Sequence, residues 1–339
     1  MSALGEISHG GWRPAPNRFL EIVGQSFYRT LVDLQDTVTV ATTGFWRSRG
    51  VKALHLPITT DSVSSPMGLG SDSSPVGIDL FGQRTYLADS MQFMLEYGCR
   101  FNEEGAWYLM PSFRGEDADA THLNQFFHSE AEIRGDLADV MASVESYMRV
   151  LADAALKECG KALSARSAGI EHIEDMAERT DFPRMTMDEA VEHLAGDPLA
   201  VHDSGQWRSL TRHGERRLLA EVSPVLWVTH FDHLSVPFYQ AYAPSGRRSA
   251  LNADLLFGIG EVVGAGERHV TGDECRSALA HHSVDEDSYR WYVAMKDATP
   301  MQTSGFGMGI ERWLMWVLSH SDIRDLQLAP RLNGVAIAP

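Results

Sequence analysis

The sequence predicts an α+β fold in which helices flank a mostly antiparallel sheet. Three observations support this prediction. Residues 106–113 and 125–134 are apolar-rich runs joined by a polar loop, as in a hairpin. Residues 136–159 carry apolar side chains at helical spacing throughout. The chain of 339 residues is 44% hydrophobic and 22% charged, which is ordinary for a protein with a sizeable core.

The first predicted element is a long amphipathic helix over residues 17–48, where apolar side chains recur every three or four positions. β-branched residues at 38–43 predict an interruption within it. Gly50 suits the end of this helix, because glycine readily adopts the left-handed conformation found there. Residues 51–59 then predict a strand that runs into Pro57.

The remaining elements are expected where apolar runs are bounded by turn residues. They are a strand and a helix within 86–99, a helix within 182–194, buried strands at 224–229 and 251–264, and a buried helix at 308–319. Thr186, with Glu189 three positions later, forms a capping-box pattern that marks the start of a helix.

The charge balance argues against a general nucleic-acid binder. The chain has 29 Lys and Arg against 46 Asp and Glu, which gives a formal net charge of −17. Nucleic-acid binders usually carry a basic stripe, because neutralising phosphates supplies much of their affinity. The balance therefore disfavours tRNA as a partner, although it leaves room for a local basic patch.

Cysteine usage and hydropathy predict a cytoplasmic protein. Cys99, Cys159 and Cys275 are far apart and form no CxxC pair, so neither a zinc knuckle nor a disulfide framework is expected. Residues 1–16 contain glycine and proline, lack a signal-like apolar run and predict an irregular N-terminal segment. No stretch approaches the ~18 apolar residues of a membrane span, so no membrane partner is expected.

The segment Gly-Phe-Gly-Met-Gly-Ile-Glu-Arg, residues 305–312, is the first candidate for chemistry. A glycine-rich turn is expected to open into a helix, with Arg312 just inside it. Glycines such as Gly309 let the backbone approach a ligand, and a helix start beside a guanidinium suits a phosphate. Taken alone, a plain turn with an exposed arginine explains the pattern better.

The predicted hairpin carries the second candidate. Arg114 and Glu116 are two positions apart, so in a strand they would point to the same face. A cation for a phosphate and a carboxylate that accepts from an amino group would suit a nucleotide, and Phe126 on the returning strand would suit stacking on a base. For this piece alone, a cross-strand salt bridge on a solvent face is the better explanation.

Asp254, Glu261 and Arg268 follow one another at intervals of seven residues and form the third candidate. Two carboxylates that bracket the apolar run 255–259 suit Mg²⁺, which prefers one or two carboxylates together with substrate phosphates. The spacing also allows the simpler explanation of strand-end acids in water.

In this order the segments resemble the catalytic core of the asparaginyl/aspartyl branch of class II aminoacyl-tRNA synthetases. Residues 50–57 resemble motif 1, a strand that ends in proline after a long helix. Residues 113–126 resemble motif 2, F-R-x-E then H-L-x-x-F, and residues 305–312 resemble motif 3, G-F-G-x-G-[FI]-E-R. Residues 254–268 resemble the intervening D-L-L…G-x-G-E-[IV]-x-G-[GA]-x-x-R, and residues 182–190 look like a family insertion.

The resemblance implies the architecture and the ligands. It implies one catalytic domain over residues 17–339, with an insertion around 178–236, built as an antiparallel sheet flanked by helices. Motif 1 would form the interface of a two-fold homodimer. The implied substrate is an amino acid and the implied cofactors are ATP and Mg²⁺, with Asp254 and Glu261 holding the metal.

The resemblance also implies roles at the ATP site. Arg114 would hold the α-phosphate, and Arg312 would stack on adenine opposite Phe126; the two arginines are the implied catalytic residues. Glu116 would read the adenine amino group and His122 would approach the γ-phosphate. The implied ATP-binding set is Arg114, Glu116, His122, Phe126, Glu261, Gly309 and Arg312.

The amino-acid site divides the branch, and Tyr-Leu-Ala-Asp-Ser-Met-Gln-Phe resembles its Y-L-x-x-S-x-Q-L segment. Ser90 and Gln92 would lie at the substrate, with Gln92 near its α-amino group. The aspartyl type has a lysine where Leu95 stands, whereas the asparaginyl type has a glutamate at the position of Glu96. Glu96 would accept from a side-chain amide and Arg268 would donate to its oxygen, which favours asparagine. An exposed helix acid is an equally good explanation of Glu96.

Several features depart from the family. Only a short segment precedes the first helix, so a stand-alone paralogue without the anticodon-binding barrel is expected. Loop 117–121 carries two acids and no base where the family loop is basic, and residues 231–239 replace a lysine-bearing segment. The loop arginine that helps His122 hold the γ-phosphate is missing, and Arg84 and Arg134 are the candidates to replace it.

The expected function is ATP-dependent activation of asparagine, or a close analogue, to an aminoacyl-adenylate. The acyl group would pass to a non-tRNA acceptor: an amine, ammonia or a carrier-protein thiol. Three alternatives remain, namely an asparaginyl-tRNA synthetase that works with a partner, an aspartate–ammonia ligase of the asparagine synthetase type, and a non-catalytic regulatory paralogue that binds an amino acid. Ammonia ranks below the other acceptors because it requires aspartate, against which Leu95 and Glu96 argue.

Overall fold

The computed structural model describes residues 12, 17–65, 74–166 and 168–336. Apart from Trp12, the predicted N-terminal segment therefore lies outside the described residues. Within the described part of the chain, none of the helices combines the length and apolar character that crossing a membrane requires.

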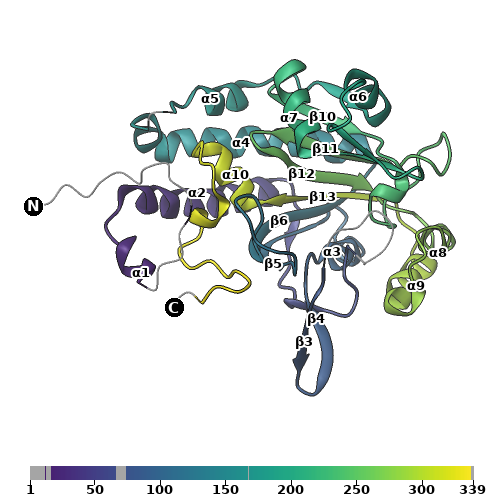
Figure 1. Cartoon of the computed structure of the whole chain (residues 1–339). Coiled ribbons are helices and arrows are strands. Elements are labelled where there is room, and N and C mark those ends of the chain that lie inside the picture. Colours follow the sequence, from purple (N-terminus) through teal and green to yellow (C-terminus); the bar gives the residue numbers. More distant parts are fainter. Residues whose placement is uncertain (1–11, 13–16, 66–73, 167, 337–339) are drawn as a thin grey trace, which may run out of the picture.

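An eight-stranded sheet forms the centre of the molecule (Figure 1). Its six inner strands run antiparallel to one another. Each edge strand pairs in parallel with the inner strand beside it. The predicted α+β class with a mostly antiparallel sheet is confirmed. In spatial order the strands are β1 (Lys52–Ala53), β5 (Ala106–Phe113), β6 (Gln125–Arg134), β13 (Thr303–Gly309), β12 (Gly260–Glu267), β11 (Asn252–Phe257), β10 (Val225–Thr229) and β7 (Arg184–Thr186).

Two long helices, α2 (Ser26–Ser48) and α4 (Leu137–Ser164), pack together on one face of the sheet, and α4 contacts β11, β12 and β13. Trp46 of α2 stacks on Phe306 of β13 with ring centroids 5.8 Å apart. The hydroxyl of Tyr147 in α4 is hydrogen-bonded to Thr42 at 2.6 Å. Because side chains alternate along a strand, Phe306 and Met308 in this core leave the intervening Gly307 on the opposite face of β13.

The predicted interruption at 38–43 is wrong, because α2 continues through it. The hydroxyls of Thr37, Thr39 and Thr43 donate to the carbonyl four residues earlier, which satisfies these side chains within the helix. The break lies earlier, after α1 (Arg18–Glu21), where Gly24 has φ +90°.

Two other boundaries differ from the prediction. Residues 51–59 do not form one strand; Lys52–Ala53 pairs with β5, whereas Thr59 belongs to a smaller sheet. Residues 251–264 form a hairpin of β11 and β12 rather than one strand, because the chain turns at Gly258 (φ +62°) and Gly260 (φ +133°), conformations that glycine allows.

The smaller sheet contains β2 (Thr59–Thr60), β4 (Gln83–Leu87) and β3 (Val76–Leu80), and the β3–β4 hairpin projects from the body. The predicted capping box is confirmed at the start of α6. The other elements are α3 (Gln92–Gly98), α5 (Glu171–Glu178), α6 (Met187–His193), β8 (Val201–Asp203), β9 (Arg208–Leu210), α7 (Arg212–Glu221), η1 (His233–Ser235), α8 (Gly272–His281), η2 (Glu286–Tyr289), α9 (Arg290–Ala298), α10 (Ile310–Val317) and η3 (Ile323–Leu326).

The predicted insertion at 178–236 and the homodimer stay predictions. Within 178–236, β7 and β10 belong to the central sheet, whereas β8 and β9 form a separate ribbon. On α2, Val32 and Val40 are exposed, at 45% and 64%, on the helix predicted to meet a second copy.

Candidate functional site

A cavity of about 250 Å³ opens on the face of the sheet opposite α4. Strands β6, β12 and β13, the loop after β5 and the start of α10 surround it. All seven residues of the predicted ATP-binding set line it: Arg114, Glu116, His122, Phe126, Glu261, Gly309 and Arg312.

The glycines of motif 3 are needed because carboxylates of β6 approach β13 closely. The predicted turn is wrong: residues 303–309 form a strand, and only Ile310 begins the helix. A Cβ placed at Gly307 would lie 2.9 Å from Oε1 of Glu130, and one at Gly305 would overlap the carboxylate of Glu132. The strand therefore presents a flat backbone surface to the cavity.

Arg114 and Glu116 lie in the loop after β5, not within the strand, so the predicted cross-strand arrangement is wrong. The side-chain amide of Asn124 donates to the carbonyls of Arg114, at 3.0 Å, and Glu116, at 2.6 Å, which fixes the loop. Nε of Arg114 and Oε2 of Glu116 are buried without a hydrogen-bond partner among the described residues. A buried donor and a buried acceptor therefore face one cavity, as a polar ligand would require.

One aromatic ring and two guanidinium groups complete this cavity. The guanidinium of Arg114 lies 5.7 Å from the ring centroid of Phe126. Nη1 of Arg312 donates to the carbonyl of Glu261 at 2.7 Å and lies 3.8 Å from its Oε2. Because these contacts hold the Arg312 side chain in the first turn of α10, this arginine is placed before any ligand arrives.

His122 at the mouth of the cavity has an arginine partner that the sequence did not reveal. Nη2 of Arg212, on α7, lies 2.8 Å from the His122 ring, and Nη1 lies 3.9 Å from Asp119. Burial lowers the pKa of His122, and the nearby charges of Arg212 and Arg312 lower it further. The ring is therefore neutral at pH 7.

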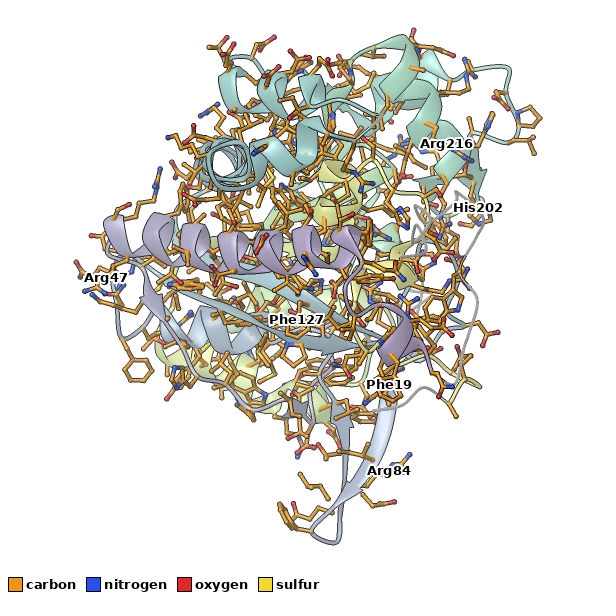
Figure 2. All side chains as sticks on the ribbon, turned by 90° about the vertical axis from the view of Figure 1, so that its left-hand side faces the viewer. Phe19, Arg47, Arg84, Phe127, His202 and Arg216 are labelled. Carbon is orange, nitrogen blue, oxygen red and sulfur yellow. The ribbon has the colours of Figure 1, made fainter. Side chains whose placement is uncertain are left out.

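Neither predicted substitute arginine reaches this cavity. Arg84 lies on the projecting hairpin (Figure 2), 3.5 Å from Asp79. Arg134 lies 3.6 Å from Glu103, away from the cavity lining. Arg212 was missed because α7 follows β6 by many residues, so no local pattern links it to His122.

A second cavity adjoins the first, and the two share four lining residues: Arg114, His128, Glu261 and Gly307. Ser90, Gln92, Asp254 and Arg268 line this second cavity as predicted. Its position next to Arg114 places any ligand there beside a ligand in the first cavity.

Arg268 is held rigidly at the wall of the second cavity. Its Nε and Nη2 donate to the carboxylate of Glu132, both at 3.0 Å, and its Nη1 donates to Oε1 of Gln240 at 2.9 Å. Arg268 and Glu132 are almost fully buried, at 3% and 0% exposure of their side chains. The pair therefore contributes donors with a fixed direction but little net charge.

Glu96 does not line the second cavity with the other predicted amino-acid-binding residues. Its carboxylate is buried behind the wall, 2.6 Å from Nζ of Lys296, and accepts a further hydrogen bond from Tyr292. The exposed-acid explanation of Glu96 is also wrong, since its side chain is 1% exposed. Lys296 is 200 residues away in the chain, so spacing could not indicate the pair.

Two acids of the second cavity were missed. Asp89 accepts from Oγ of Ser64 at 2.7 Å, and Glu130 accepts from Oγ of Ser90 at 2.6 Å and lies 3.0 Å from Nδ1 of His128. Both carboxylates line the cavity. Glu130 and Glu132 lie two positions apart on β6 and so share one face, and a search for period-two acids on the returning strand would have found Glu130.

Asp254 and Glu261 lie on the adjacent strands β11 and β12, and Glu215 of α7 joins them. Burial raises the pKa of Asp254 well above its usual value, and the charges of Glu261 and Glu215 raise it further. Burial and Glu261 also raise the pKa of Glu215, to about 7. Gly260 permits this approach, because a Cβ there would overlap the Glu215 carboxylate.

This cluster of carboxylates fits Mg²⁺. Three carboxyl groups face one another. Among the described residues, Arg312 is the only cation that lowers the pKa of Asp254, so the cluster has more negative than positive charge. Asp254 and Glu261 line the second cavity and offer the oxygen ligands that Mg²⁺ prefers. A bound Mg²⁺ would supply charge that neutralises substrate phosphates.

The raised pKa of Glu215 predicts a pH-dependent stability. A carboxyl whose pKa is raised by folding stabilises the fold below its unfolded value of 4.5, and this contribution is lost as the pH rises through about 7. Without Mg²⁺, the Tm is expected to fall over this range. Glu215→Gln is expected to reduce the fall, and thermal melts across pH with and without Mg²⁺ measure it. Glu192→Gln, at an exposed position on α6, is the control; an equal effect there contradicts the assignment.

Comparisons with known proteins agree with this geometry. Residues 14–333 match the family model described as tRNA synthetases class II (D, K and N). The asparagine–tRNA ligase of Thermoplasma acidophilum is 26% identical over 321 residues, covering 93% of this chain and 72% of the relative. That of Pyrococcus furiosus is 31% identical over 261 residues, covering 74% of this chain and 57% of the relative, so the match spans little more than half of its length.

A solved structure gives the same result. The crystal structure of asparaginyl-tRNA synthetase from Pyrococcus horikoshii complexed with asparaginyl-adenylate superposes with a TM-score of 0.86 at 25% identity, over 95% of this chain and 73% of that one. The resemblance inferred from the motifs is thereby confirmed. The chain belongs to the class II tRNA synthetase (D, K and N) family, whose members are ATP-dependent aminoacyl ligases.

Proposed function

We propose that this chain activates asparagine with ATP to form asparaginyl-adenylate. The observation that carries the proposal is the pair of adjoining cavities, which meet at Arg114 and Gly307. A nucleotide in the first cavity and an amino acid in the second would bring the α-phosphate and the carboxylate together at Arg114. The relative of known structure from P. horikoshii is complexed with this adenylate, which supports the same assignment.

In the proposed reaction, a carboxylate oxygen of asparagine forms a bond to the α-phosphorus as the bond to the bridging oxygen breaks and pyrophosphate leaves. Arg114 donates to the α-phosphate, where negative charge builds up. Adenine lies between Phe126 and Arg312, and Oε2 of Glu116 accepts from its amino group. His122 and Arg212 hold the γ-phosphate. Catalysis rests on positioning and charge, since no side chain needs to transfer a proton.

The second cavity suits a zwitterion with an amide side chain. Asp89 and Glu130 place negative charge where an α-ammonium group would bind, beside Ser90 and Gln92. Arg268 offers donors to the side-chain oxygen.

The charges behind the wall favour an amide over a carboxylate. Glu132 pairs with Arg268, and Glu96 pairs with both Lys296, at 2.6 Å, and Arg100, at 3.4 Å, so each of these cations has a carboxylate partner behind the wall. A free carboxylate would be desolvated there without a counter-charge, which disfavours aspartate. The role proposed for Glu96 therefore changes from a direct contact with the amide to neutralising Lys296.

Amino-acid-dependent ATP–pyrophosphate exchange across the twenty amino acids, with Mg²⁺, tests the proposal. Exchange is expected with asparagine and to be at least ~10²-fold slower with aspartate, the discrimination that a mismatched polar group produces. Faster exchange with aspartate would favour the aspartate–ammonia ligase alternative. Absence of exchange with every amino acid would favour the regulatory alternative.

For the acceptor, we propose a molecule other than tRNA, such as an amine or a carrier thiol. Loop 117–121 supports this because it is acidic, and Asp119 contacts Arg212 and His122 within the chain rather than leaving cations free for an acceptor stem. The names of the relatives favour the alternative, an asparaginyl-tRNA synthetase. Aminoacylation and gel-shift assays with total tRNA at low salt separate the two, once exchange with asparagine is established. Charged tRNA would overturn the non-tRNA acceptor but not the activation step.

A further inference from the structure

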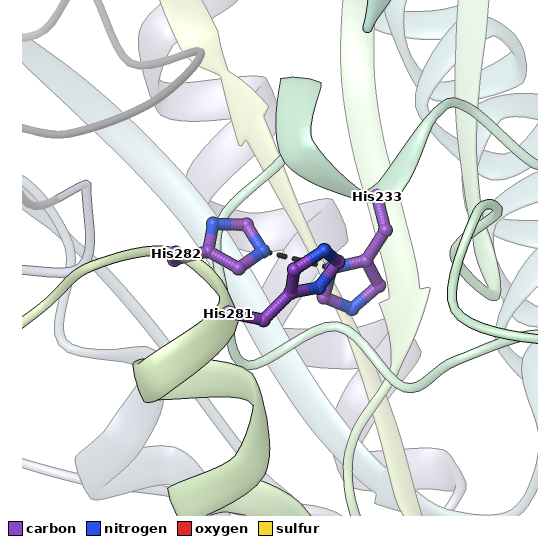
Figure 3. A group of neighbouring side chains, drawn as sticks. All are labelled: His233, His281 and His282. Atoms are coloured by element: carbon purple, nitrogen blue, oxygen red, sulfur yellow. Dashed lines mark hydrogen bonds between the residues drawn. The ribbon is translucent and has the colours of Figure 1, made fainter. Parts of the chain in front are cut away.

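Three histidines converge outside both cavities (Figure 3). His233 begins η1, while His281 ends α8 and His282 follows it. One ring nitrogen from each histidine lies within 4.8 Å of the others, and Nδ1 of His233 is 2.8 Å from Nε2 of His282. His233 and His282 are buried, at 0% and 3% exposure, whereas His281 is partly exposed.

The contacts around the cluster fix the orientation of two rings. Nε2 of His233 donates to the carbonyl of Gln240 at 2.8 Å, so Nδ1 is the nitrogen with the lone pair, and it points into the cluster. The hydroxyl of Tyr242 lies 3.0 Å from Nδ1 of His281, and the Tyr242 ring stacks on His233 with centroids 4.0 Å apart. A ring N–H held by a backbone carbonyl is the usual support of a metal-ligating histidine.

We propose that His233, His281 and His282 bind one divalent transition-metal ion of the zinc type. Three imidazoles suit Zn²⁺, Co²⁺ or Ni²⁺, whereas Mg²⁺ prefers oxygen. At metal–nitrogen distances of about 2.0–2.1 Å, tetrahedral ligands lie roughly 3.4 Å apart, so the rings need only small shifts. The partly exposed side at His281 leaves a path for the ion and a fourth position for water.

The chemistry of the rings agrees with this geometry. Burial, together with the neighbouring histidines, lowers the pKa of His233 to about 3 and that of His282 to about 4. Both rings are therefore neutral at pH 7, which is the form that binds a metal. A hydrogen bond between two buried histidines accounts for His233 and His282 alone; it gives no reason for His281 to lie within reach.

The site would hold a wall of the second cavity to α8. His233 begins the segment that continues to Gln240, and Ser235, Pro237, Tyr239 and Gln240 of this segment line that cavity. The backbone of Gln240 accepts from His233, and its side chain accepts from Arg268. A bound ion would therefore fix the position of Arg268 through two hydrogen bonds, although it touches no residue predicted to contact ATP.

Cobalt binding tests the proposal. The untagged chain, stripped with a chelator, is titrated with Co²⁺ in excess Mg²⁺, which saturates the carboxylate cluster. One Co²⁺ per chain is expected, with the visible absorption of a tetrahedral centre, and Zn²⁺ should displace it. Absence of that spectrum, or binding of less than a tenth of an equivalent, would overturn the proposal.

Variants locate the ion without relying on activity. His281→Ala removes the most exposed ligand and is expected to weaken binding by more than the roughly 10–100-fold that loss of an outer-shell partner causes. Tyr242→Phe is expected to weaken it less. His202→Ala, at an exposed histidine on β8, should leave affinity and spectrum unchanged. If His281→Ala and His282→Gln, each folded by circular dichroism, bind as the unaltered chain does, the cluster is not the site.

Discussion

Replacing Arg114 with alanine is expected to lower the rate of ATP–pyrophosphate exchange by about 10²–10³-fold or more, the usual effect of losing a donor at developing charge. Arg114 lines both cavities and its Nε is buried without a partner among the described residues, so alanine breaks no hydrogen bond of Nε and removes a contact with the Phe126 ring. The Tm is therefore expected to change little. Exchange with asparagine and a thermal melt measure the two effects.

Arg84→Ala is the matched control for this experiment. Arg84 is an arginine of the projecting hairpin with a side chain 64% exposed, and it lies outside both cavities. Its exchange rate is expected to equal that of the unaltered chain. If Arg114→Ala also retains the full rate, Arg114 is not at the α-phosphate and the proposed arrangement of the two ligands fails.

The second large effect is expected on stability. Glu96→Gln should lower the free energy of unfolding by about 3–5 kcal/mol, because Nζ of Lys296 would remain buried without its counter-charge. Glu96→Gln combined with Lys296→Met should recover part of the loss, since the buried charge of Lys296 is then removed while Arg100, which lies 3.4 Å from Glu96, keeps its charge. Denaturant unfolding of the two single variants and the double variant measures the coupling.

A surface pair on α4 provides the control. Nζ of Lys157 lies 2.6 Å from Asp153, the same distance as in the buried pair, but their side chains are 68% and 51% exposed. Asp153→Asn is expected to cost less than about 1 kcal/mol, because solvent screens the charges. If Glu96→Gln lowers the free energy of unfolding by as little as Asp153→Asn does, the prediction that the buried pair contributes strongly to stability is wrong.

Glu96→Gln also tests the proposed specificity. With Lys296 uncompensated behind the wall, exchange with aspartate is expected to rise relative to asparagine. An unchanged ratio in the folded variant would limit Glu96 to a structural role. The two effects of the pair can be measured separately: unfolding measures its effect on stability, and the exchange ratio measures its effect on specificity.

The sequence alone predicted the fold class and the residues of the first cavity. Motif 2 lies on one hairpin and motif 3 on the strand that pairs with it, so neighbouring residues in each motif remain neighbours in space. Local spacing is sufficient in such a case, and all seven predicted ATP-binding residues line one cavity.

The predictions of local conformation were less accurate where that conformation depends on the contacts of polar side chains. The threonines of α2 suggested a break, but their hydroxyls bond within the helix. The glycines of motif 3 suggested a turn. In the structure they leave room for the carboxylates of Glu130 and Glu132, which approach the backbone of β13, and this approach follows from the pairing of β6 with β13.

The sequence by itself determined the family, the α+β fold and the set of groups that line the first cavity. The tertiary structure decided which distant side chains meet: Glu96 with Lys296, His122 with Arg212, Glu215 with Asp254 and Glu261, and His233 with His281 and His282. These contacts join elements that have no shared periodicity. Their charges and orientations follow from how the helices pack on the sheet, and packing is a property of the whole fold rather than of any local pattern.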